Sequence, residues 1–244
     1  MKAFLLAAGL GTRLRPLTWT VPKCLVPIQG RPLLAWWMDL FEQHRISEIL
    51  INTNYLPDPV RNFIKEYNQT RGKVKLVESY EKELLGSGGT VLINRNFVEN
   101  EEDFFICYAD NLTNADLSSM MDFHKKNHAL LTMGLFHTNN PTGCGIAVYN
   151  KEGKITEFVE KPKYPKSDLA NAGIYVVNKK IYDYIPNKSF VDFGGDVLPE
   201  LVGKMYGYPI KEYLLDVGTW PNYEEAQELS LIHISEPTRL RRIS

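Results

Sequence analysis

The sequence of 244 residues is poor in three features that would assign it to large classes of protein. Its cysteines, Cys24, Cys107 and Cys144, are odd in number, far apart and without Cys-x-x-Cys spacing, so neither a disulfide framework nor a zinc site is indicated. No apolar run approaches the roughly 20 residues that a membrane-spanning helix needs. Lys and Arg number 28 against 29 Asp and Glu, and this balance disfavours a nucleic-acid-binding surface.

The composition suits one soluble α/β domain of medium size, because 44% of the residues are hydrophobic and can fill a well-buried core. A secretory signal is not indicated, since Gly-Leu-Gly-Thr-Arg at residues 9–13 interrupts the short N-terminal apolar run. We therefore expect a cytoplasmic protein with small-molecule substrates and with no nucleic-acid or membrane partner. A homo-oligomer is compatible with the sequence. The cysteines are expected to be small buried apolar residues.

The last sixteen residues, 229–244, differ from the rest of the chain. Residues 229–239 read LSLIHISEPTR, which resembles an in-frame translation of a sequencing adapter, with LRRIS as continued read-through. The alternative is a real C-terminal helix followed by a basic tail that is broken at Pro237. We expect residues 1–228 to form a single domain and 229–244 to be a non-native tail, so that the native C-terminus and any further domain would be missing.

The chain is organised around the stretch from Leu5 to Pro32, LLAAGLGTRLRPLTWTVPKCLVPIQGRP. The apolar run from Ala3 to Ala8 predicts a buried parallel strand, and ligands of open α/β sheets bind beyond the carboxyl ends of such strands. Gly9 and Gly11 follow, and glycines let backbone N–H groups approach an anion closely. The cations that can neutralise such an anion are Arg13, Arg15 and Lys23.

Two common phosphate-binding motifs are excluded by what this stretch lacks. Leu14 stands where the dinucleotide fingerprint G-x-G-x-x-G has its third glycine, and no G-K-[ST] follows to make a P-loop. The alternative is a plain glycine-rich turn whose arginines are solvated. The combination of glycines, two arginines and the Pro22-Lys23 step favours a local anion site instead.

Strands and helices alternate through the first half of the chain, which predicts parallel strands joined by right-handed crossovers in a Rossmann-like unit. The second half is rich in β-structure and predicts an antiparallel extension of the sheet, with a hairpin turn at residues 150–153. The fold class expected is therefore α/β, with a mixed, mainly parallel sheet flanked by helices and a small β-rich lobe. Helices are expected at 32–45 with Pro32 at its first position, 57–67, 87–94 and 193–202, and strands at 48–52, 73–77, 103–108, 130–137, 145–149, 155–159, 173–178 and 212–215.

Two aspartates follow predicted strands. Asp110 comes after the apolar run at 104–108, at the carboxyl end where the glycine loop should also lie, and a carboxylate there is a suitable Mg²⁺ ligand. The alternative is that Asp110 only caps the turn at Asn111, and Asp110 alone does not decide between the two. Asp216 repeats the arrangement of apolar strand, aspartate and glycine.

Further motifs occur in a fixed order along the chain. They read AAGLGTRLRPLT with VPKCLVPIQGRPLL, LLGSGGT near residue 84, YADNL near 108, FVEKP near 158, NAGIYVV near 171 and LLDVGTWPNYEEA near 214. In these motifs the chain resembles the sugar-1-phosphate nucleotidyltransferases, the pyrophosphorylases that make nucleotide sugars. The resemblance covers residues 1 to about 228 and implies a nucleotide-diphospho-sugar transferase fold.

The resemblance implies a role for each residue that matches a motif. Arg13 would contact the β- and γ-phosphates, Lys23 the α-phosphate and the attacking phosphate, and Asp110 with Asp216 would hold Mg²⁺. The LGSGGT loop would hold the base and ribose. The nucleotide-binding residues implied are Leu6, Ala8, Gly9, Gly11, Thr12, Gly86 and Gly88.

The same resemblance implies a sugar-phosphate site in the second half of the chain. Glu160 would bind the sugar hydroxyls, Lys161 the sugar phosphate and Asn171 a further hydroxyl, while Gly145 would pass close under the sugar. Taken without the resemblance, a Glu-Lys pair is most often an exposed charged turn. Each of the other two positions also has a turn-only interpretation.

The activity implied is transfer of a nucleoside monophosphate to a sugar 1-phosphate, which supplies nucleotide sugar for cell-surface polysaccharide or glycan synthesis. GTP is favoured, because the chain resembles short bacterial mannose-1-phosphate and heptose-1-phosphate guanylyltransferases, although it departs from their commoner form at Ser87 and Thr90. The alternatives are a uridylyl- or thymidylyltransferase, a non-catalytic nucleotide-sugar-binding regulator, and a glycosyltransferase, whose usual Asp-x-Asp motif is missing at Asp110. The sugar is not indicated.

Overall fold

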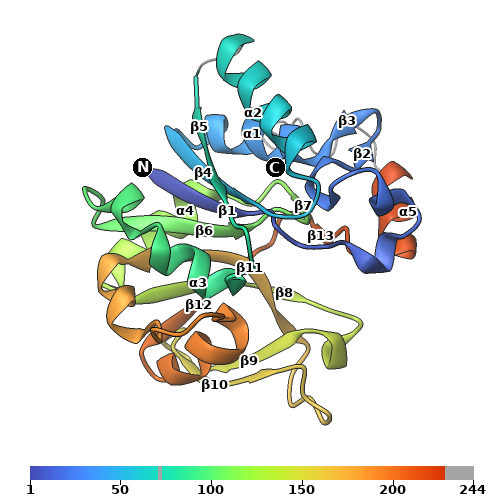
Figure 1. The fold of residues 1–244 in the computed structure, drawn as a ribbon. Coiled ribbons are helices and arrows are strands. Elements are labelled where there is room, and N and C mark those ends of the chain that lie inside the picture. The colour runs from blue at the N-terminus through green and yellow to red at the C-terminus, as the bar shows by residue number, and fades with distance from the viewer. Residues whose placement is uncertain (71–72, 229–244) are drawn as a thin grey trace, which may run out of the picture.

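The structure is a computed structural model that describes residues 1–70 and 73–228. The expectation of a non-native tail at 229–244 lies outside the described residues. Within them, a nine-stranded mixed sheet carries helices on both faces, and this confirms the predicted fold class (Figure 1). The described helices include none that is long and apolar enough to cross a membrane.

The parallel half of the sheet has the order β5-β4-β1-β6. All three pairings are parallel, with β1 between β4 and β6, so the carboxyl ends of these strands meet at one edge. This is the arrangement that alternating strands and helices predict. The strands are β1 (Lys2–Leu6), β4 (Glu48–Thr53), β5 (Lys75–Tyr80) and β6 (Asp103–Tyr108).

The antiparallel half continues from β6 through β11, which also pairs with β8 and β9. The β9–β10 hairpin is closed as predicted by a turn in which the Gly153 N–H donates to the Asn150 carbonyl at 2.9 Å. β12 adds in parallel to β8. The strands are β8 (Leu131–His137), β9 (Gly145–Tyr149), β10 (Ile155–Glu160), β11 (Leu169–Asn178) and β12 (Met205–Pro209).

Helices α1, α2 and α4 cover one face of the sheet, and α3 with the turns between residues 179 and 201 covers the other. A short pair, β7 (Asn111–Thr113) with β13 (Leu214–Asp216), lies beyond β6, and α5 packs beside the small β2–β3 pair (Figure 1). The remaining bounds are α1 (Leu33–Gln43), α2 (Pro57–Thr70), α3 (Gly86–Ile93), α4 (Leu117–Lys126), α5 (Trp220–Glu228), β2 (Pro27–Ile28) and β3 (Arg31–Pro32).

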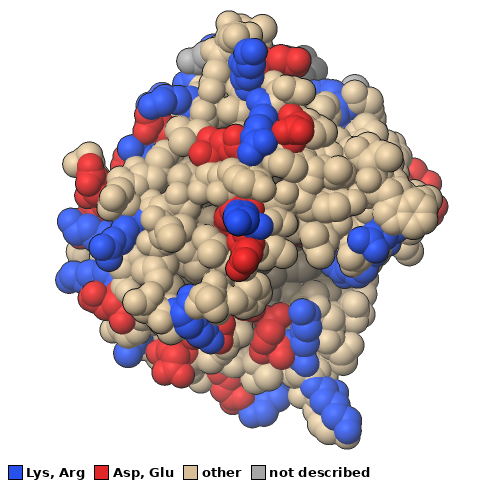
Figure 2. Space-filling view, viewed as in Figure 1, with Lys and Arg blue, Asp and Glu red and all other residues tan. Residues whose placement is uncertain are grey.

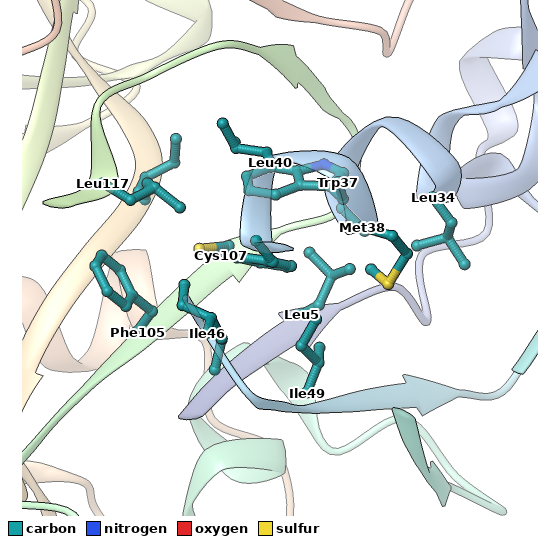
Figure 3. Close-up of a cluster of buried hydrophobic side chains, with 14 of the residues drawn as sticks. Leu5, Leu34, Trp37, Met38, Leu40, Ile46, Ile49, Phe105, Cys107 and Leu117 are labelled. Carbon is teal, nitrogen blue, oxygen red and sulfur yellow. The ribbon is translucent and has the colours of Figure 1, made fainter. Parts of the chain in front are cut away.

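The core is divided between the two faces because side chains alternate along each strand. In β1, Leu5 faces the cluster under α1, which includes Trp37 and Cys107 (Figure 3), whereas Phe4 faces the cluster that contains Tyr175. All five side chains are essentially inaccessible to solvent. The double-sided burial explains why the strand sequences are continuous apolar runs.

Several predicted elements differ from the structure. Pro32 precedes α1 and does not begin it, because it is paired with Pro27 in β3 and has an extended conformation. The stretch 193–202 is a π-turn followed by a 3₁₀ turn and is not one α-helix. Cys24 and Cys107 are buried as expected, but Cys144 is only half-buried.

Candidate active site

Two cavities lie at the carboxyl edge of the parallel strands. One, the loop cavity, has a volume of about 290 Å³ and is lined by the glycine loop and the first turn of α3. The other, the lobe cavity, has a volume of about 240 Å³ and is lined by the antiparallel lobe. Tyr108, Asp110 and Asp192 line both cavities, so two ligands bound there would meet at the end of β6.

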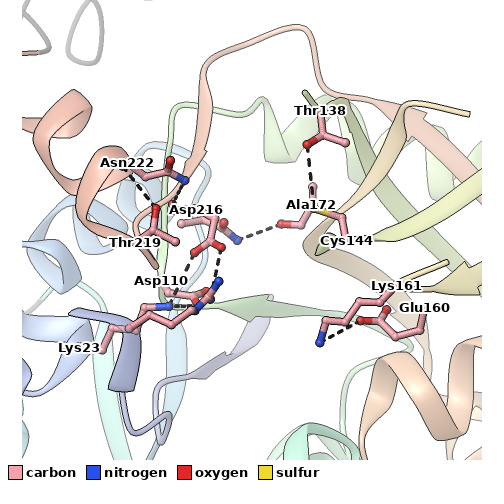
Figure 4. Close-up of polar contacts among 12 residues, drawn as sticks. Lys23, Asp110, Thr138, Cys144, Glu160, Lys161, Ala172, Asp216, Thr219 and Asn222 are labelled. Atoms are coloured by element: carbon pink, nitrogen blue, oxygen red, sulfur yellow. Dashed lines mark hydrogen bonds and ion pairs between the residues drawn. The ribbon is translucent and has the colours of Figure 1, made fainter. Parts of the chain in front are cut away.

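Lys23 is the buried cation at this junction. It lies on a 3₁₀ turn, is 9% exposed, and its Nζ is 2.5 Å from Oδ2 of Asp110 and 3.7 Å from Oδ1 of Asp216 (Figure 4). The Nη2 of Arg13 is 3.8 Å from Oδ2 of Asp216, on a largely exposed side chain. The structure therefore brings together the four residues that the sequence singles out for catalysis and metal binding.

The backbone holds the two aspartates side by side. Asp216 pairs with Asn111 in the β13–β7 ladder, and the Val217 N–H donates to the Asp110 carbonyl at 2.8 Å. The Asn222 Nδ2 donates to the Asp216 carbonyl at 2.7 Å, which anchors the turn after β13. These bonds fix the positions of Asp110 and Asp216 through their backbone atoms, so they do not occupy the carboxylate oxygens.

The Asp216 carboxylate is suited to a divalent cation. Its Oδ1 is buried and accepts no hydrogen bond from the described residues, although the side chain as a whole is 43% exposed. Burial raises the pKa of Asp216, and the negative charge of Asp110 raises it further, against the opposing effects of Lys23 and Arg13. A carboxylate oxygen that accepts no hydrogen bond from the described residues and lies beside a second carboxylate is a hard-oxygen donor set that fits Mg²⁺.

No group of three or more His, Cys, Asp and Glu residues is arranged to hold a metal within residues 1–70 and 73–228. Mg²⁺ is commonly held in proteins by one or two carboxylates, with water and substrate phosphates completing its coordination. Asp110 and Asp216 fit that mode of binding.

Gly11 shapes the glycine loop through its backbone. Its φ of 63° is left-handed, and a Cβ there would lie 3.1 Å from the Cβ of Lys23 and 3.0 Å from Cγ2 of Thr18. The Thr18 hydroxyl donates to the Gly11 carbonyl at 2.7 Å. Gly11 thus lets the loop pack directly onto the turn that carries Lys23.

The first turn of α3 is attached to the segment around Val191. The N–H of Gly88 donates to the Val191 carbonyl, and the N–H of Val191 donates to the Leu85 carbonyl, each at 2.8 Å. A Cβ on Gly88 would lie 2.7 Å from Cγ1 of Val191. Gly88 therefore packs behind the loop cavity, whereas Gly86 lines it.

A buried polar network supports the loop cavity and was not identified from the sequence. Glu81 is 4% exposed, and its Oε1 accepts hydrogen bonds from Asn52 Nδ2 and the Thr90 hydroxyl. Its Oε2 accepts from the N–H of Leu85 at 3.2 Å, and Asn52 Oδ1 accepts from the N–H of Ala7 at 2.6 Å. The sequence signal is the position of Glu81 three residues before LLGSGGT and of Asn52 at the end of a strand.

The four residues expected to bind a sugar phosphate all line the lobe cavity. Burial raises the pKa of Glu160 and the charge of Asp192 adds to this, although Lys161 opposes it. A Cβ on Gly145 would lie 2.5 Å from Oε2 of Glu160, so a side chain there would displace this carboxylate. Asn171 donates from Nδ2 to the Tyr175 hydroxyl at 2.6 Å, which orients its amide.

The other residues expected to bind nucleotide divide into two sets. Leu6, Ala8, Gly9 and Gly86 line the loop cavity, as do Lys23 and Asp110. Gly11, Thr12, Arg13 and Gly88 lie outside the linings of both cavities. The lining residues that were not singled out from the sequence include Asn52, Glu81, Ser87, Tyr108, Phe190 and Asp192.

Gly86→Ala is expected to destabilise the fold more than Gly30→Ala. Both glycines have a left-handed φ, 76° and 78°, so each alanine incurs a backbone cost of about 1–2 kcal/mol. At Gly86 the new Cβ would also lie 2.7 Å from the Val191 carbonyl carbon, adding about 1–3 kcal/mol, whereas Gly30 has nothing within 4 Å. Urea unfolding measures the difference, and equal losses would show that packing against Val191 is not what requires glycine at 86.

The charged side chains on the visible face of the molecule show no strong excess of one sign (Figure 2). On the face drawn in Figure 2, Lys and Arg side chains are interspersed with Asp and Glu. The cations that matter are therefore local to the junction of the cavities, where Lys23 and Arg13 lie.

The sequence of the chain is similar to a known protein family and to several characterised relatives. Residues 2–231 match the protein family described as nucleotidyl transferase. The chain is 30% identical over 243 residues to the UTP–glucose-1-phosphate uridylyltransferase of Synechocystis sp., covering 93% of this chain and 62% of that protein. It is 30% identical over 222 residues to the mannose-1-phosphate guanyltransferase beta-A of Xenopus laevis, covering 89% and 61% respectively. The chain thus spans about three fifths of the length of these curated relatives.

The fold itself has close counterparts among solved structures. The crystal structure of HddC from Yersinia pseudotuberculosis superposes with a TM-score of 0.78 at 25% identity, covering 93% of this chain and 98% of that chain. The similarity extends over almost the whole of both chains, so the lobe that carries Glu160 and the half that carries Lys23 are both part of the shared architecture.

Proposed function

The chain belongs to the nucleotidyl transferase family, and we propose that it transfers the nucleoside monophosphate of a nucleoside triphosphate to a sugar 1-phosphate. The products are a nucleotide sugar and pyrophosphate. The observation that carries this proposal is the junction of the two cavities at Asp110, with Lys23 and Asp216 beside it. Residues 1–228 are proposed to act as one catalytic unit.

The proposed reaction is an in-line displacement at the α-phosphorus. An oxygen of the sugar phosphate forms a new bond to this phosphorus while the bond to the β-phosphate oxygen breaks, and pyrophosphate leaves with the electron pair. No protein nucleophile or strong general base is needed, because a phosphate monoester is already anionic at neutral pH. Catalysis then depends on alignment and charge neutralisation.

Lys23 is proposed to bind the two phosphates that react. Its Nζ lies at the junction of the cavities, where the attacking phosphate and the α-phosphate would both be within reach. Arg13, whose side chain is 64% exposed, is free to turn from Asp216 toward the β- and γ-phosphates. Mg²⁺ bound to Asp110 and Asp216 would neutralise the charge that builds on the phosphates during transfer.

The lobe cavity is proposed to bind the sugar. Half-buried Glu160 can accept hydrogen bonds from sugar hydroxyls, and the Asn171 amide adds both a donor and an acceptor. Lys161 has 67% of its side chain exposed at the rim and can pair with the sugar phosphate. Because Gly145 has no side chain, the Glu160 carboxylate can keep its position in the cavity wall.

GTP is the proposed nucleotide. Glu81 places a buried carboxylate on the wall of the loop cavity, and its Oε2 accepts only the N–H of Leu85 among the described hydrogen bonds. That oxygen can accept one more donor, and guanine offers adjacent N–H donors at N1 and N2 where uracil has one at N3. Relatives named as a uridylyltransferase and as a guanyltransferase are equally similar, so UTP is the competing candidate.

The experiment that tests the proposed function measures pyrophosphate release from the full chain with Mg²⁺. Each of GTP, UTP, dTTP, ATP and CTP is combined with a panel of sugar 1-phosphates that includes those of mannose, glucose and heptose. Release that requires both substrates and is fastest with GTP is expected. Nucleotide binding without turnover would identify a regulator, and consumption of a nucleotide sugar without pyrophosphate would identify a glycosyltransferase.

A further inference from the structure

The mouth of the loop cavity has two large apolar side chains in contact with solvent. Phe190 is 52% exposed and Leu84 is 37% exposed, and they are the only exposed large apolar side chains among the described residues that line this cavity. Ligand pockets are lined mainly by hydrophobic and aromatic side chains, so these two side chains are available to contact a ligand that enters the cavity.

The core does not require Phe190. Its neighbours Val191 and Phe193 are fully buried and anchor this part of the chain in the cluster that contains Tyr175. Phe190 itself is absent from that cluster and lies on a segment outside any helix or strand. Packing of the core therefore does not explain why an aromatic side chain is exposed at this position.

The backbone beside Phe190 is nevertheless well fixed. The Val191 N–H donates to the Leu85 carbonyl at 2.8 Å, and the Asp192 N–H donates to the Asp196 carboxylate at 2.8 Å. The preceding turn is held by an ion pair between Lys188 and Asp196, also at 2.8 Å. The segment that carries Phe190 is therefore attached to the first turn of α3 at the adjacent residue.

The cavity is divided in a way that identifies which part of a nucleotide Phe190 would contact. Lys23 and Asp110 mark the end of the loop cavity that meets the lobe cavity, where the phosphates would lie. Phe190 lines the loop cavity but not the lobe cavity, whereas Asp192, two residues later, lines both. The hydrogen bond from Val191 to the Leu85 carbonyl holds Phe190 beside Leu85. The N–H of Leu85 itself donates to Glu81, the residue proposed to face the base, so Phe190 belongs to the nucleoside part of the site.

We infer that Phe190 packs its ring against the base of the bound nucleoside triphosphate and is a specificity-determining residue that favours the larger purine surface. This inference rests on the proposed function. Stacking between an aromatic side chain and a base is worth about 1–3 kcal/mol on alanine substitution, which corresponds to roughly 5- to 150-fold in affinity. Phe190 is a binding residue in this role and takes no part in the chemistry.

The test is equilibrium binding of GTP to the full chain by calorimetry, in the absence of sugar phosphate so that no turnover is needed. Phe190→Ala is expected to weaken GTP binding about ten-fold or more, and Phe190→Trp to retain it. In turnover assays the KM for GTP should rise with little change in kcat. Tyr164→Ala, at an aromatic residue that is 79% exposed and lines neither cavity, is the matched control and should change neither quantity.

Inorganic tripolyphosphate separates stacking from an effect on loop shape, because it has phosphates and no base. Its binding should be the same in the wild type and in Phe190→Ala. Equal weakening of tripolyphosphate and GTP, or unchanged GTP binding, would overturn the inference, as would a wild type that binds no nucleoside triphosphate. A wild type that binds GTP but never releases pyrophosphate would instead overturn the proposed function and leave the binding test intact.

Discussion

Lys23→Met is expected to lower the rate of pyrophosphate release by about 100- to 1,000-fold, the loss that follows removal of one preorganised charged donor at a reacting centre. Lys23 is 9% exposed and lies within ion-pair distance of both candidate metal ligands, whereas Arg13 pairs with Asp216 alone among the described ion pairs. Methionine keeps the length of the side chain and removes its charge. The measurement is single-turnover pyrophosphate release at saturating substrates.

Two further variants show whether the loss is specific. Lys75→Met removes a 67% exposed lysine from the first residue of β5, at the end of the strand opposite the carboxyl edge where the cavities lie. This variant should leave the rate unchanged. Lys23→Arg keeps the charge but replaces a compact ammonium with a planar fork that does not fit the same space, so it should recover only part of the rate. A Lys23→Met protein that melts like the wild type and turns over at a similar rate would refute the assignment.

The fold was predictable where local pattern and packing agree. The apolar residues at 49–51 and 104–107 became the centres of β4 and β6, because the central positions of strands buried on both faces need apolar residues. The interpretation failed at 193–202, where apolar residues at helical spacing lie on a π-turn and a 3₁₀ turn. Two consecutive glycines, Gly194 and Gly195, weaken helix formation there, and hydrogen bonds to Asp192 and Asp196 replace the helical ones.

The site was predictable only where a residue type implies chemistry by itself. Asp110 and Asp216 are carboxylates at strand ends and Lys23 is a cation on the turn after the glycine loop, and the structure brings the three together from segments 87 or more residues apart. Glu81 and Asn52 carry only a positional signal, because the role of a buried carboxylate that accepts only neutral donors is defined by its tertiary partners. Sequence spacing contains no information on which neighbour would satisfy them.

Replacing either aspartate with asparagine is expected to abolish most of the metal-dependent activity, with a loss of about 100-fold or more for each. Removing the metal with a chelator should reduce the wild type to the same level. Asp216→Asn should not lower the melting temperature, because burial and Asp110 raise the pKa of Asp216, which means that folding favours its neutral form. Asp122→Asn, at an exposed position on α4, is the charge-matched control.

The double variant distinguishes one shared metal site from two independent roles. If Asp110 and Asp216 hold the same cation, losing the second ligand after the first costs little, and the double variant should be no more than a few-fold slower than either single variant. Independent contributions would instead multiply to about 10,000-fold. Metal titrations of each single variant give a second readout. The two carboxylates differ in their surroundings, since the Asp216 Oδ1 is buried without a hydrogen-bond donor and Asp110 accepts a hydrogen bond from Lys23 at 2.5 Å. Both single variants should need more Mg²⁺ for half-maximal rate, and a variant that keeps the wild-type requirement would exclude that residue as a ligand.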